Sequence, residues 1–380
     1  MYPIITHIDG VLPAIAGRQD FVVARREGYT AVDYVFAGAD TFDCPIRREC
    51  RGLKFDAKGR LIARPFEKFF NVGEKPHTQP DLLDWSQPHT IMEKLDGSMI
   101  HPAIVHNEVV FMTRMGRTDV ARKAERHLTR ELAARLYWHL SVGLTPIFEF
   151  TAPDNRIVVD YPASALTLLA IRGTVGGAYM DRATLERDAA EFGVPVVPLH
   201  APPTGAEFLD YARQVRGMEG FVVRFADGLT VKAKGEDYVL KHRARDSILQ
   251  EKNVLALVLK GEIDDVLPML EPADRLRVED YRDDVQSSVR VLAGYVDRMV
   301  RSGARLDQKT FATEHLRESS KEERTLAFQV RSGADAHEAA TAYLLKHTGS
   351  QTAVDSVRHL FRASLNPPDN DNVASIGAAA

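Results

Sequence analysis

Short apolar runs separated by turn residues characterise the chain up to about residue 243. The runs are rich in Val, Ile, Phe and Tyr, which is typical of β-strands joined by turns. The segments 56–59 (DAKG) and 226–228 (ADG) lie between pairs of such runs and favour hairpins, so we expect mostly antiparallel pairing. The expected strands lie within residues 21–36, 90–105, 108–116, 145–153, 156–161, 166–173, 220–228 and 229–235.

Two segments in this part of the chain have helical periodicity instead. Residues 117–140 repeat apolar side chains at helical spacing, and residues 181–193 do the same. Asp181 is the expected N-cap of the second helix, and Gly193 is expected to end it. This part of the chain therefore combines strands with two helices.

The pattern changes after about residue 244, where strand signals become rare. Residues 245–270, 272–303 and 335–347 all have helical periodicity. We therefore expect an α+β fold, with a mostly antiparallel sheet domain over residues 1–243 and an all-helical domain over residues 244–366. The polar, small-residue segment 367–380 is expected to be disordered.

Composition narrows the class of protein. The chain of 380 residues is 44% hydrophobic and 27% charged, as in a soluble globular protein. No apolar run reaches the length of a membrane helix, and the first residues lack the basic start of a signal peptide. Cys44 and Cys50 are the only cysteines, which fits a reducing compartment. We therefore expect a cytoplasmic protein without membrane contact.

Charge is distributed unevenly along the sequence. Residues 251–380 hold 17 Lys plus Arg against 21 Asp plus Glu, whereas residues 1–250 hold equal numbers of each sign. A non-specific nucleic-acid binder is usually basic overall, which this chain is not. Any nucleic acid would therefore bind a local basic groove.

Lys94 stands in an apolar run, IMEKLDGSMI, that predicts a partly buried strand. A buried, unpaired ammonium costs several kcal/mol, so this lysine needs a partner or a special environment. The K-x-D-G pattern by itself fits a surface lysine on a hairpin equally well. Whether Lys94 is a surface lysine or a lysine in a special environment depends on the other charged residues of the strands.

Lys232 and Lys234 are the strongest companions of Lys94. The period of a strand puts both ammonium groups on one face, about 7 Å apart, and Val231 and Ala233 on the other face. Two cations on one face repel unless an anion lies near them. A solvated edge strand is the alternative, because edge lysines also deter aggregation.

Further polar residues in this part of the chain suit a nucleoside triphosphate. Arg51 and Lys68 can hold phosphates, whereas Glu149 and Glu219 can hold Mg²⁺ or ribose hydroxyls. The aromatic pair 69–70 can stack on a base. A lysine attacks phosphorus only as the neutral amine, which neighbouring cations favour.

Several of these runs resemble a known family. The segments EKLDGS, RG, EKFFN, FEFTAPDNRIV, EGFVV and VKAK followed by YV occur in order from about residue 51 to 243. They resemble the covalent nucleotidyltransferase superfamily of ligases and capping enzymes. Within it they are most similar to the phage-type RNA ligase 1 family, which repairs broken tRNA.

The resemblance implies an ATP-dependent RNA ligase that uses Mg²⁺, for which Mn²⁺ can substitute. Lys94 would form lysyl-AMP, AMP would pass to an RNA 5′-phosphate, and an RNA 3′-hydroxyl would displace it. The same resemblance implies catalytic roles for Lys232 and Lys234 at the α-phosphate, and a metal ligand at Glu219. It implies nucleotide-binding roles for Arg51, Lys68, Phe70, Gly97, Glu149, Glu219, Gly220 and Tyr238.

One position departs from the family pattern, since Arg114 stands where the family often has a lysine. A guanidinium still neutralises phosphate, but as a fork rather than a point charge. Asp264 and Asp265 in the helical part match a family acidic pair, although a solvated helix face accounts for them as well. The helical domain is expected to set the specificity for RNA, namely single-stranded or nicked tRNA ends.

Three alternatives remain open at this level. A DNA ligase and a GTP-dependent mRNA capping enzyme share the superfamily motifs, but both normally carry a β-barrel after the catalytic domain. A non-catalytic RNA-binding module is the third alternative, against which the intact set of lysines and carboxylates argues. The sequence indicates no protein partner.

Overall fold

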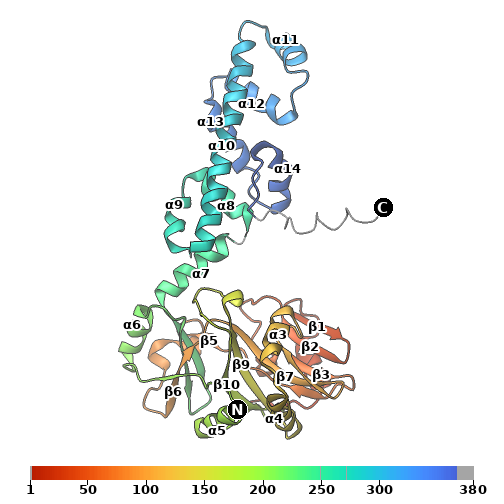
Figure 1. Cartoon of the computed structure of the whole chain (residues 1–380), viewed down its shortest axis with the longest axis vertical. Coiled ribbons are helices and arrows are strands. Elements are labelled where there is room, and N and C mark those ends of the chain that lie inside the picture. Colours follow the sequence, from red (N-terminus) through yellow and green to blue (C-terminus); the bar gives the residue numbers. More distant parts are fainter. Residues whose placement is uncertain (1, 249, 271, 366–380) are drawn as a thin grey trace. The chain divides into compact units, whose positions relative to one another are not determined.

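The computed structural model describes residues 2–248, 250–270 and 272–365. Contacts within the chain divide it into two compact units between Val239 and Leu240. The sequence prediction placed a domain boundary at 243/244. Helix α7 (Glu236–Ile248) contains both positions (Figure 1).

The first unit consists of three sheets with short helices around them (Figure 1). The pairings are antiparallel except between β13 and β5, so the expected α+β class with mostly antiparallel strands is confirmed. The first sheet has the order β1 (Phe21–Arg26), β2 (Tyr29–Tyr34), β3 (Leu53–Asp56) and β4 (Leu61–Ala63). The second has the order β10 (Ala165–Gly173), β9 (Leu144–Thr151), β7 (Ser98–Val105) and β8 (Glu108–Met112). The third has the order β11 (Leu199–His200), β6 (His89–Lys94), β12 (Gly220–Phe225), β13 (Thr230–Lys234) and β5 (Phe70–Asn71).

The apolar stretch 90–105 supplies strands to two different sheets. Strand β6 pairs with β12, whereas β7 pairs with β8 and β9. The turn at Asp96 and Gly97 therefore carries the chain from one sheet to the next, and Lys94 is the last residue of β6. The hairpins expected at 56–59 and 226–228 both form.

One expected strand is absent, since residues 156–161 form bends. Their backbone has another partner: the N–H groups of Val158 and Val159 both donate to the carboxylate of Asp96, each at 2.7 Å. A β-branched sequence is therefore held out of the sheets by a buried side chain. Local strand propensity is weak against such a tertiary contact.

The helices of this unit agree with the sequence in part. Helix α5 (Arg182–Phe192) begins after Asp181, which accepts from the N–H of Thr184, and ends at Gly193 with φ of 68°, as predicted. The single helix expected over 117–140 is wrong. Thr129 caps a new helix there, so the segment forms α3 (Asp119–Ala124), η4 (Glu125–His127) and α4 (Arg130–Ser141). The prediction omitted α1 (Leu12–Ile15), α2 (Pro45–Glu49) and α6 (Ala206–Gln214).

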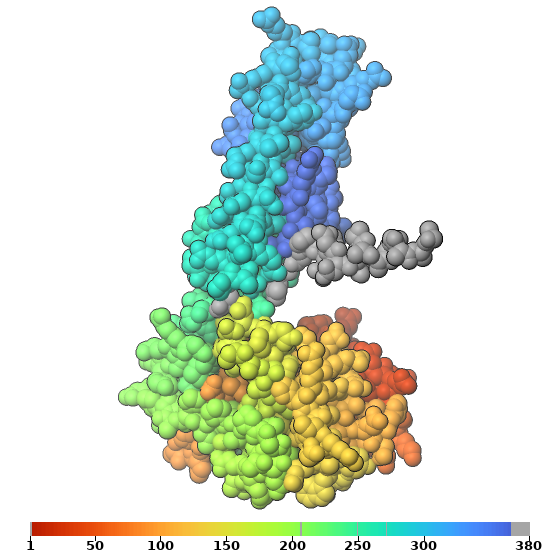
Figure 2. All heavy atoms as spheres, in the orientation of Figure 1, coloured from red at the N-terminus to blue at the C-terminus, as the bar shows by residue number. Residues whose placement is uncertain are grey.

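The second unit is helical throughout its described residues, as predicted. Its elements are the part of α7 after residue 239, α8 (Glu251–Lys260), α9 (Ile263–Val266), η6 (Leu267–Met269), α10 (Pro272–Ser302), α11 (Gln308–Thr310), η7 (Phe311–His315), α12 (Lys321–Arg331), α13 (Ala336–Leu345) and α14 (Gln351–Phe361). Helix α10 runs along much of this unit (Figures 1 and 2) and buries one face in its apolar core. None of the helices described has a stretch that would span a bilayer. The tail expected to be disordered lies outside the described residues.

A cluster of buried charges connects several elements of the first unit. Glu49 at the end of α2 accepts from Arg64 at 3.0 Å and from both terminal nitrogens of Arg172 at 2.8 Å. Arg172 also pairs with Glu67 at 3.1 Å. Burial alone would raise the pKa of Glu49, but Arg172 and Arg64 outweigh burial and lower it. Glu49 therefore stays ionised inside the protein.

Backbone carbonyls complete the partners of the two arginines. Arg64 donates to Pro3 at 2.9 Å and to Val175 at 2.7 Å. Arg172 donates to Pro65 and to Gly177, each at 2.7 Å. Such full pairing is what makes a buried ion cluster tolerable. The cluster ties the N-terminal segment, β10 and the segment that follows β4 to one point.

We predict that Arg172→Met lowers the free energy of unfolding of the first unit by about 3–5 kcal/mol, because it leaves buried carboxylates without their partner. Urea unfolding followed by tryptophan fluorescence measures this change. Trp85 and Trp138 are the two tryptophans of the chain and both lie in this unit, so the signal reports on it alone.

Arg135→Met is the matched control. Arg135 pairs with Glu191 at 2.8 Å, but their side chains are 50% and 45% exposed. Loss of an exposed pair costs at most about 1 kcal/mol. Equal destabilisation by the two substitutions would contradict a stabilising role for the buried cluster.

Candidate active site

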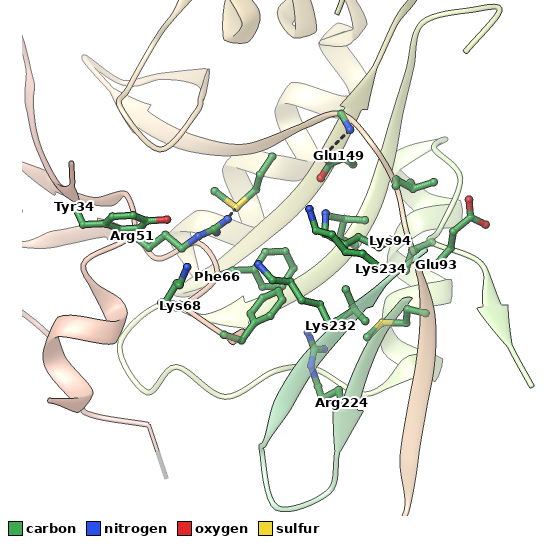
Figure 3. Close-up of a pocket in the computed structure, with 18 residues that line it drawn as sticks. Tyr34, Arg51, Phe66, Lys68, Glu93, Lys94, Glu149, Arg224, Lys232 and Lys234 are labelled. Carbon is green, nitrogen blue, oxygen red and sulfur yellow. Dashed lines mark hydrogen bonds between the residues drawn. The ribbon is translucent and has the colours of Figure 1, made fainter. Parts of the chain in front are cut away.

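A cavity of about 250 Å³ lies in the first unit, with walls from β6, β9, β12 and β13 and from the segment before β5 (Figure 3). Its charged walls carry more cations than carboxylates. The cations are Arg51, Lys68, Lys94, Arg224, Lys232 and Lys234. The apolar part consists of Phe66, Phe69, Met92, Leu95, Met99, Leu169, Val197 and Val222, and the remaining residues are Tyr34, Glu93, Gly97 and Glu149.

Strand register places the predicted lysines next to one another. Gly220 on β12 lies opposite Lys94 on β6 and opposite Lys234 on β13. Lys232 lies two residues before Lys234 on β13, and the ammonium groups of all three lysines point into the cavity (Figure 3). Val231 and Ala233 face the apolar core on the other side of the sheet, as predicted.

Gly220 has a structural reason to be glycine. Its φ is +142°, and a Cβ there would lie 2.1 Å from the carbonyl oxygen of Ala233. A larger residue would push β13 away from β12. Gly220 is thus required for the close strand packing that brings Lys94 and Lys234 together.

Glu219 is the partner that the placement of Lys94 demands. One carboxylate oxygen lies 2.6 Å from Nζ of Lys94, and the other lies 2.8 Å from Nζ of Lys234. The Glu219 side chain is 4% exposed. A single buried carboxylate therefore lies between two ammonium groups and fixes the direction of both.

Lys232 has no such partner among the described carboxylates. Burial, and after it the charges of Lys68, Lys94 and Lys234, lower its pKa to about 8. An anion in the cavity would relieve this repulsion. The cavity is therefore prepared for a negatively charged ligand.

Glu149 on β9 lies in the opposite wall and is 9% exposed. Burial raises its pKa to about 8; Lys94 opposes this, Glu219 adds to it, and Arg51 opposes it. Its oxygen accepts from the N–H of Gly97 at 3.1 Å. Near neutral pH this carboxyl group is largely protonated, so it can donate as well as accept a hydrogen bond.

Asp96 and Tyr238 act together on the turn after Lys94. Asp96 is 1% exposed and, besides its bonds from residues 158 and 159, accepts from the hydroxyl of Tyr238 at 2.7 Å. The Tyr238 ring lies 5.0 Å from Nζ of Lys234. Tyr238 does not line the cavity, so it contacts Lys234 from outside the cavity. Asp96 was not singled out as a site residue, although the K-x-D-G spacing contains it.

Gly97 lines the cavity and also packs closely against β9. A Cβ there would clash with the carbonyl oxygen of Phe150 on β9. That this glycine lets the backbone approach the nucleotide closely stays a prediction. Gly97 lets the turn lie against β9, where its N–H meets Glu149.

Only one ring of the expected aromatic pair 69–70 lines this cavity. Phe70 is 3% exposed and is not among the residues that line this cavity. Phe66 and Phe69 line it instead, with their rings edge to face at 5.9 Å. Phe69 precedes β5, whereas Phe70 is the first residue of that strand and packs in an apolar core.

Arg51 and Lys68 both line the cavity, as predicted (Figure 3). A terminal nitrogen of Arg51 lies 3.3 Å from the sulfur of Met99, a weak acceptor. Nζ of Lys68 lies 5.6 Å from the centre of the Tyr34 ring. Neither cation has a carboxylate partner in the described part of the chain.

Arg114 lies outside the cavity and is fully engaged. Its Nε donates to both oxygens of Asp33, at 3.2 and 3.1 Å. Its two terminal nitrogens donate to the hydroxyl and the carbonyl of Tyr34, each at 3.1 Å. Arg114 is thus placed to hold Tyr34, which lines the cavity, rather than to hold phosphate itself.

Arg224 is a cavity residue that the sequence prediction omitted. Its guanidinium lies 3.8 Å from the centre of the Tyr179 ring, and its Nε is buried without a hydrogen-bond partner. Alternation along β12 puts it on the same face as Val222 and Gly220, which would have indicated its position.

The acidic pair of the helical unit, Asp264 and Asp265, lies on a solvated face. Asp264 is 76% exposed and pairs with Arg282.

The donor set fits a polyphosphate better than an all-protein metal site. No group of three or more His, Cys, Asp or Glu side chains that could hold a metal occurs among the residues described. Both oxygens of Glu219 are bound by lysines. Magnesium typically takes one or two carboxylates and fills its shell with phosphate oxygens and water, so it would enter this cavity together with a nucleotide.

Comparison with known proteins gives a consistent result. A family model described as RNA ligase matches residues 49–249. A Thermovibrio ammonificans protein named "Putative RNA ligase" is 31% identical over 281 residues, which are 68% of this chain and 70% of that protein. RNA ligase 1 of bacteriophage TS2126 is 28% identical over 164 residues, covering 40% of this chain and 42% of its own length.

Solved structures give weaker matches. An archaeal ATP-dependent RNA ligase aligns with a TM-score of 0.48 at 16% identity, over 93% of this chain and 96% of its own. A Naegleria gruberi RNA ligase mutant with ATP and Mn aligns with a TM-score of 0.35 at 20% identity, over 41% of this chain and 52% of its own.

We predict that Glu149→Gln changes how the stability of the first unit depends on pH. Because the pKa of Glu149 is raised from 4.5 to about 8, the folded protein keeps a proton between these values that the unfolded chain loses. Wild-type stability therefore falls relative to the variant as pH rises from about 5 to about 8, by up to about 1.4 kcal/mol per pH unit. Urea unfolding by tryptophan fluorescence at several pH values measures the difference, and a constant difference would contradict the raised pKa.

Proposed function

Because the chain belongs to the RNA ligase family, we propose that it joins RNA 5′-phosphate and 3′-hydroxyl ends with ATP, through AMP carried on Lys94. One observation carries the assignment of residues. Lys94, at the end of β6, is aimed into a cavity whose adjacent strands supply Glu219, Lys232 and Lys234. The match to the family includes all four positions.

In the first step, Nζ of Lys94 attacks the α-phosphorus of ATP as the bond to pyrophosphate breaks. The attacking amine must give up a proton, and Glu219 lies 2.6 Å away as an acceptor. Lys232 and Lys234 neutralise charge on the phosphate oxygens, which is the main protein contribution to phosphoryl transfer. Mg²⁺, with Mn²⁺ as a substitute, would supply further charge neutralisation on the phosphates.

The remainder of the nucleotide fits the other walls. The apolar part with Phe66 and Phe69 suits a base. A protonated Glu149 suits a ribose hydroxyl, which both donates and accepts a hydrogen bond. Arg51 and Lys68, without carboxylate partners, are left for phosphate oxygens.

Two further steps complete the reaction. AMP passes from Lys94 to the RNA 5′-phosphate and forms a 5′–5′ anhydride, which frees the lysine. The RNA 3′-hydroxyl then attacks the phosphate of the 5′ end, and AMP leaves. The first two steps react at the phosphorus of AMP and the third at the phosphorus of the RNA 5′ end. In each step negative charge develops on phosphate oxygens, which the lysines of the cavity can neutralise.

The physiological substrate is proposed as a broken tRNA, with specificity set by the helical unit. This unit is acidic in net charge, so we assign it shape recognition rather than the main phosphate contacts. We infer a cytoplasmic site of action. Two of the relatives are phage proteins, which favours action in a phage-infected cell.

We predict that Lys94→Ala abolishes transfer of label from α-labelled ATP to the protein, because no other amine has this position. Lys58→Ala, at an exposed hairpin lysine, is the control and should be labelled like the wild type. Gel analysis after denaturation measures the covalent adduct. Robust labelling of Lys94→Ala would contradict the assignment.

Two comparisons separate the alternatives. Labelling by α-labelled GTP in preference to ATP would indicate a capping enzyme, and sealing of nicked duplex DNA in preference to single-stranded RNA would indicate a DNA ligase. We expect ATP and RNA to be preferred. An absence of any adduct would leave the non-catalytic RNA-binding module.

A further inference from the structure

A second cavity, of about 400 Å³, lies beside the first and shares Lys68 and Phe69 with it. Arg48, Phe70, His77 and the hairpin residues 226–230 form much of its wall. We propose that this second cavity binds the 5′-terminal phosphate of the RNA, an inference that rests on the proposed function. The assignment depends on unneutralised charge and on position.

Three cations surround the buried ring of Phe70. Arg48 and Lys68 line the cavity, with the guanidinium 5.9 Å and Nζ 5.5 Å from the ring centre. Lys75 does not line it, but its Nζ lies 5.4 Å from the same ring centre. The described carboxylates form no ion pair with any of the three. Like charges gathered around one ring repel, so an anion among them would stabilise the arrangement.

The acidic residues in the wall do not cancel this charge. Glu49 and Glu67 line the cavity but belong to the buried cluster with Arg64 and Arg172. Asp227, at the hairpin end, accepts from the N–H of Leu229 at 2.8 Å. Burial lowers the pKa of His77, and the charges of Arg48 and Lys75 lower it further, so the potential here is positive.

The position of the cavity suits a phosphate that must reach Lys94. The N–H of Lys68 donates to the carbonyl of Arg48 at 2.7 Å, which fixes helix α2 against the segment that carries Lys68. Lys68 therefore contacts both cavities. A terminal phosphate held by Arg48 would lie one side chain away from the cavity that holds AMP.

Arg48 and His77 differ in what they contribute to binding a phosphate. The planar guanidinium of Arg48 can form two parallel hydrogen bonds to a terminal phosphate. Its Nε donates to the carbonyl of Phe42 at 3.0 Å, so the fork is held in place and its terminal nitrogens stay available. His77, more exposed, can add one further bond.

The test compares binding of one RNA oligomer that carries a 5′-phosphate with the same oligomer that carries a 5′-hydroxyl, without ATP. We expect the wild type to prefer the phosphate by about tenfold or more, as charge-assisted hydrogen bonds allow. Arg48→Gln should reduce this preference to near unity, whereas labelling of Lys94 by ATP stays unchanged. RNA 5′-adenylation by the variant should fall accordingly.

Arg47→Gln is the matched control on the same helix. Arg47 donates to the carbonyls of Thr41 and Asp40 and lines neither cavity. Arg47→Gln should keep the wild-type preference for the oligomer with the 5′-phosphate. His77→Ala is the second variant, which should weaken the preference without disturbing the fold even if Arg48→Gln unfolds in the fluorescence assay.

The outcomes are distinct. Retention of the full phosphate preference by Arg48→Gln, or by His77→Ala where the first variant unfolds, would overturn the inference. A raised KM for ATP in the labelling of Lys94 would overturn it too, because the cavity would then hold the ATP polyphosphate. Failure of the wild type to form an adduct with AMP would contradict the proposed function. The comparison of 5′-phosphate with 5′-hydroxyl RNA would still test whether this cavity binds the terminal phosphate.

Discussion

The ion cluster around Glu49 is the constraint on which the first unit depends. Arg64 and Arg172, both fully buried, take the two oxygens of one carboxylate, and Glu67 is held by the same Arg172. Because the chain continues directly from Glu67 to Lys68, the cluster also fixes the segment that lines both cavities. The functional cations are therefore placed by charges that are themselves paired within the protein. All four charged side chains of the cluster are buried, so the ion pairs among them dominate its geometry.

The second constraint is the carboxylate of Glu219 between Lys94 and Lys234. Three adjacent strands bring these residues together, and Gly220 removes the side chain that would separate them. The pairing explains how a reactive lysine is tolerated at a partly buried strand end, since its charge is compensated in the resting protein. The same pairing leaves Lys232 uncompensated, and this lysine has the lowered pKa. Glu219 thus fixes the direction of Lys94, whereas Lys232 has no carboxylate partner among the described residues and can bind an anion.

Residue chemistry was easier to predict than residue contacts. Alternation along β13 correctly placed Lys232 and Lys234 on one face, because strand period is a local property. It did not distinguish Phe69 from Phe70, since only the packed unit decides which face is the cavity. The sequence left the role of Arg114 open, and its partners Asp33 and Tyr34 are distant in sequence. Arg224 was missed because its surroundings come from Tyr179 on a separate segment.

The sequence by itself determined the class of fold, the strands that alternate clearly, the cap of helix α5, the change to helices in the last third and the family motifs. These features depend on short-range patterns or on the residues themselves. The tertiary structure decided that residues 156–161 stay out of the sheets, that β6 and β7 enter different sheets, and that Glu219 lies between two lysines. Each of these depends on a contact between residues far apart in the chain, such as the bonds from Val158 and Val159 to Asp96. Local propensity does not encode such contacts, because their energy exists only after the sheets have packed.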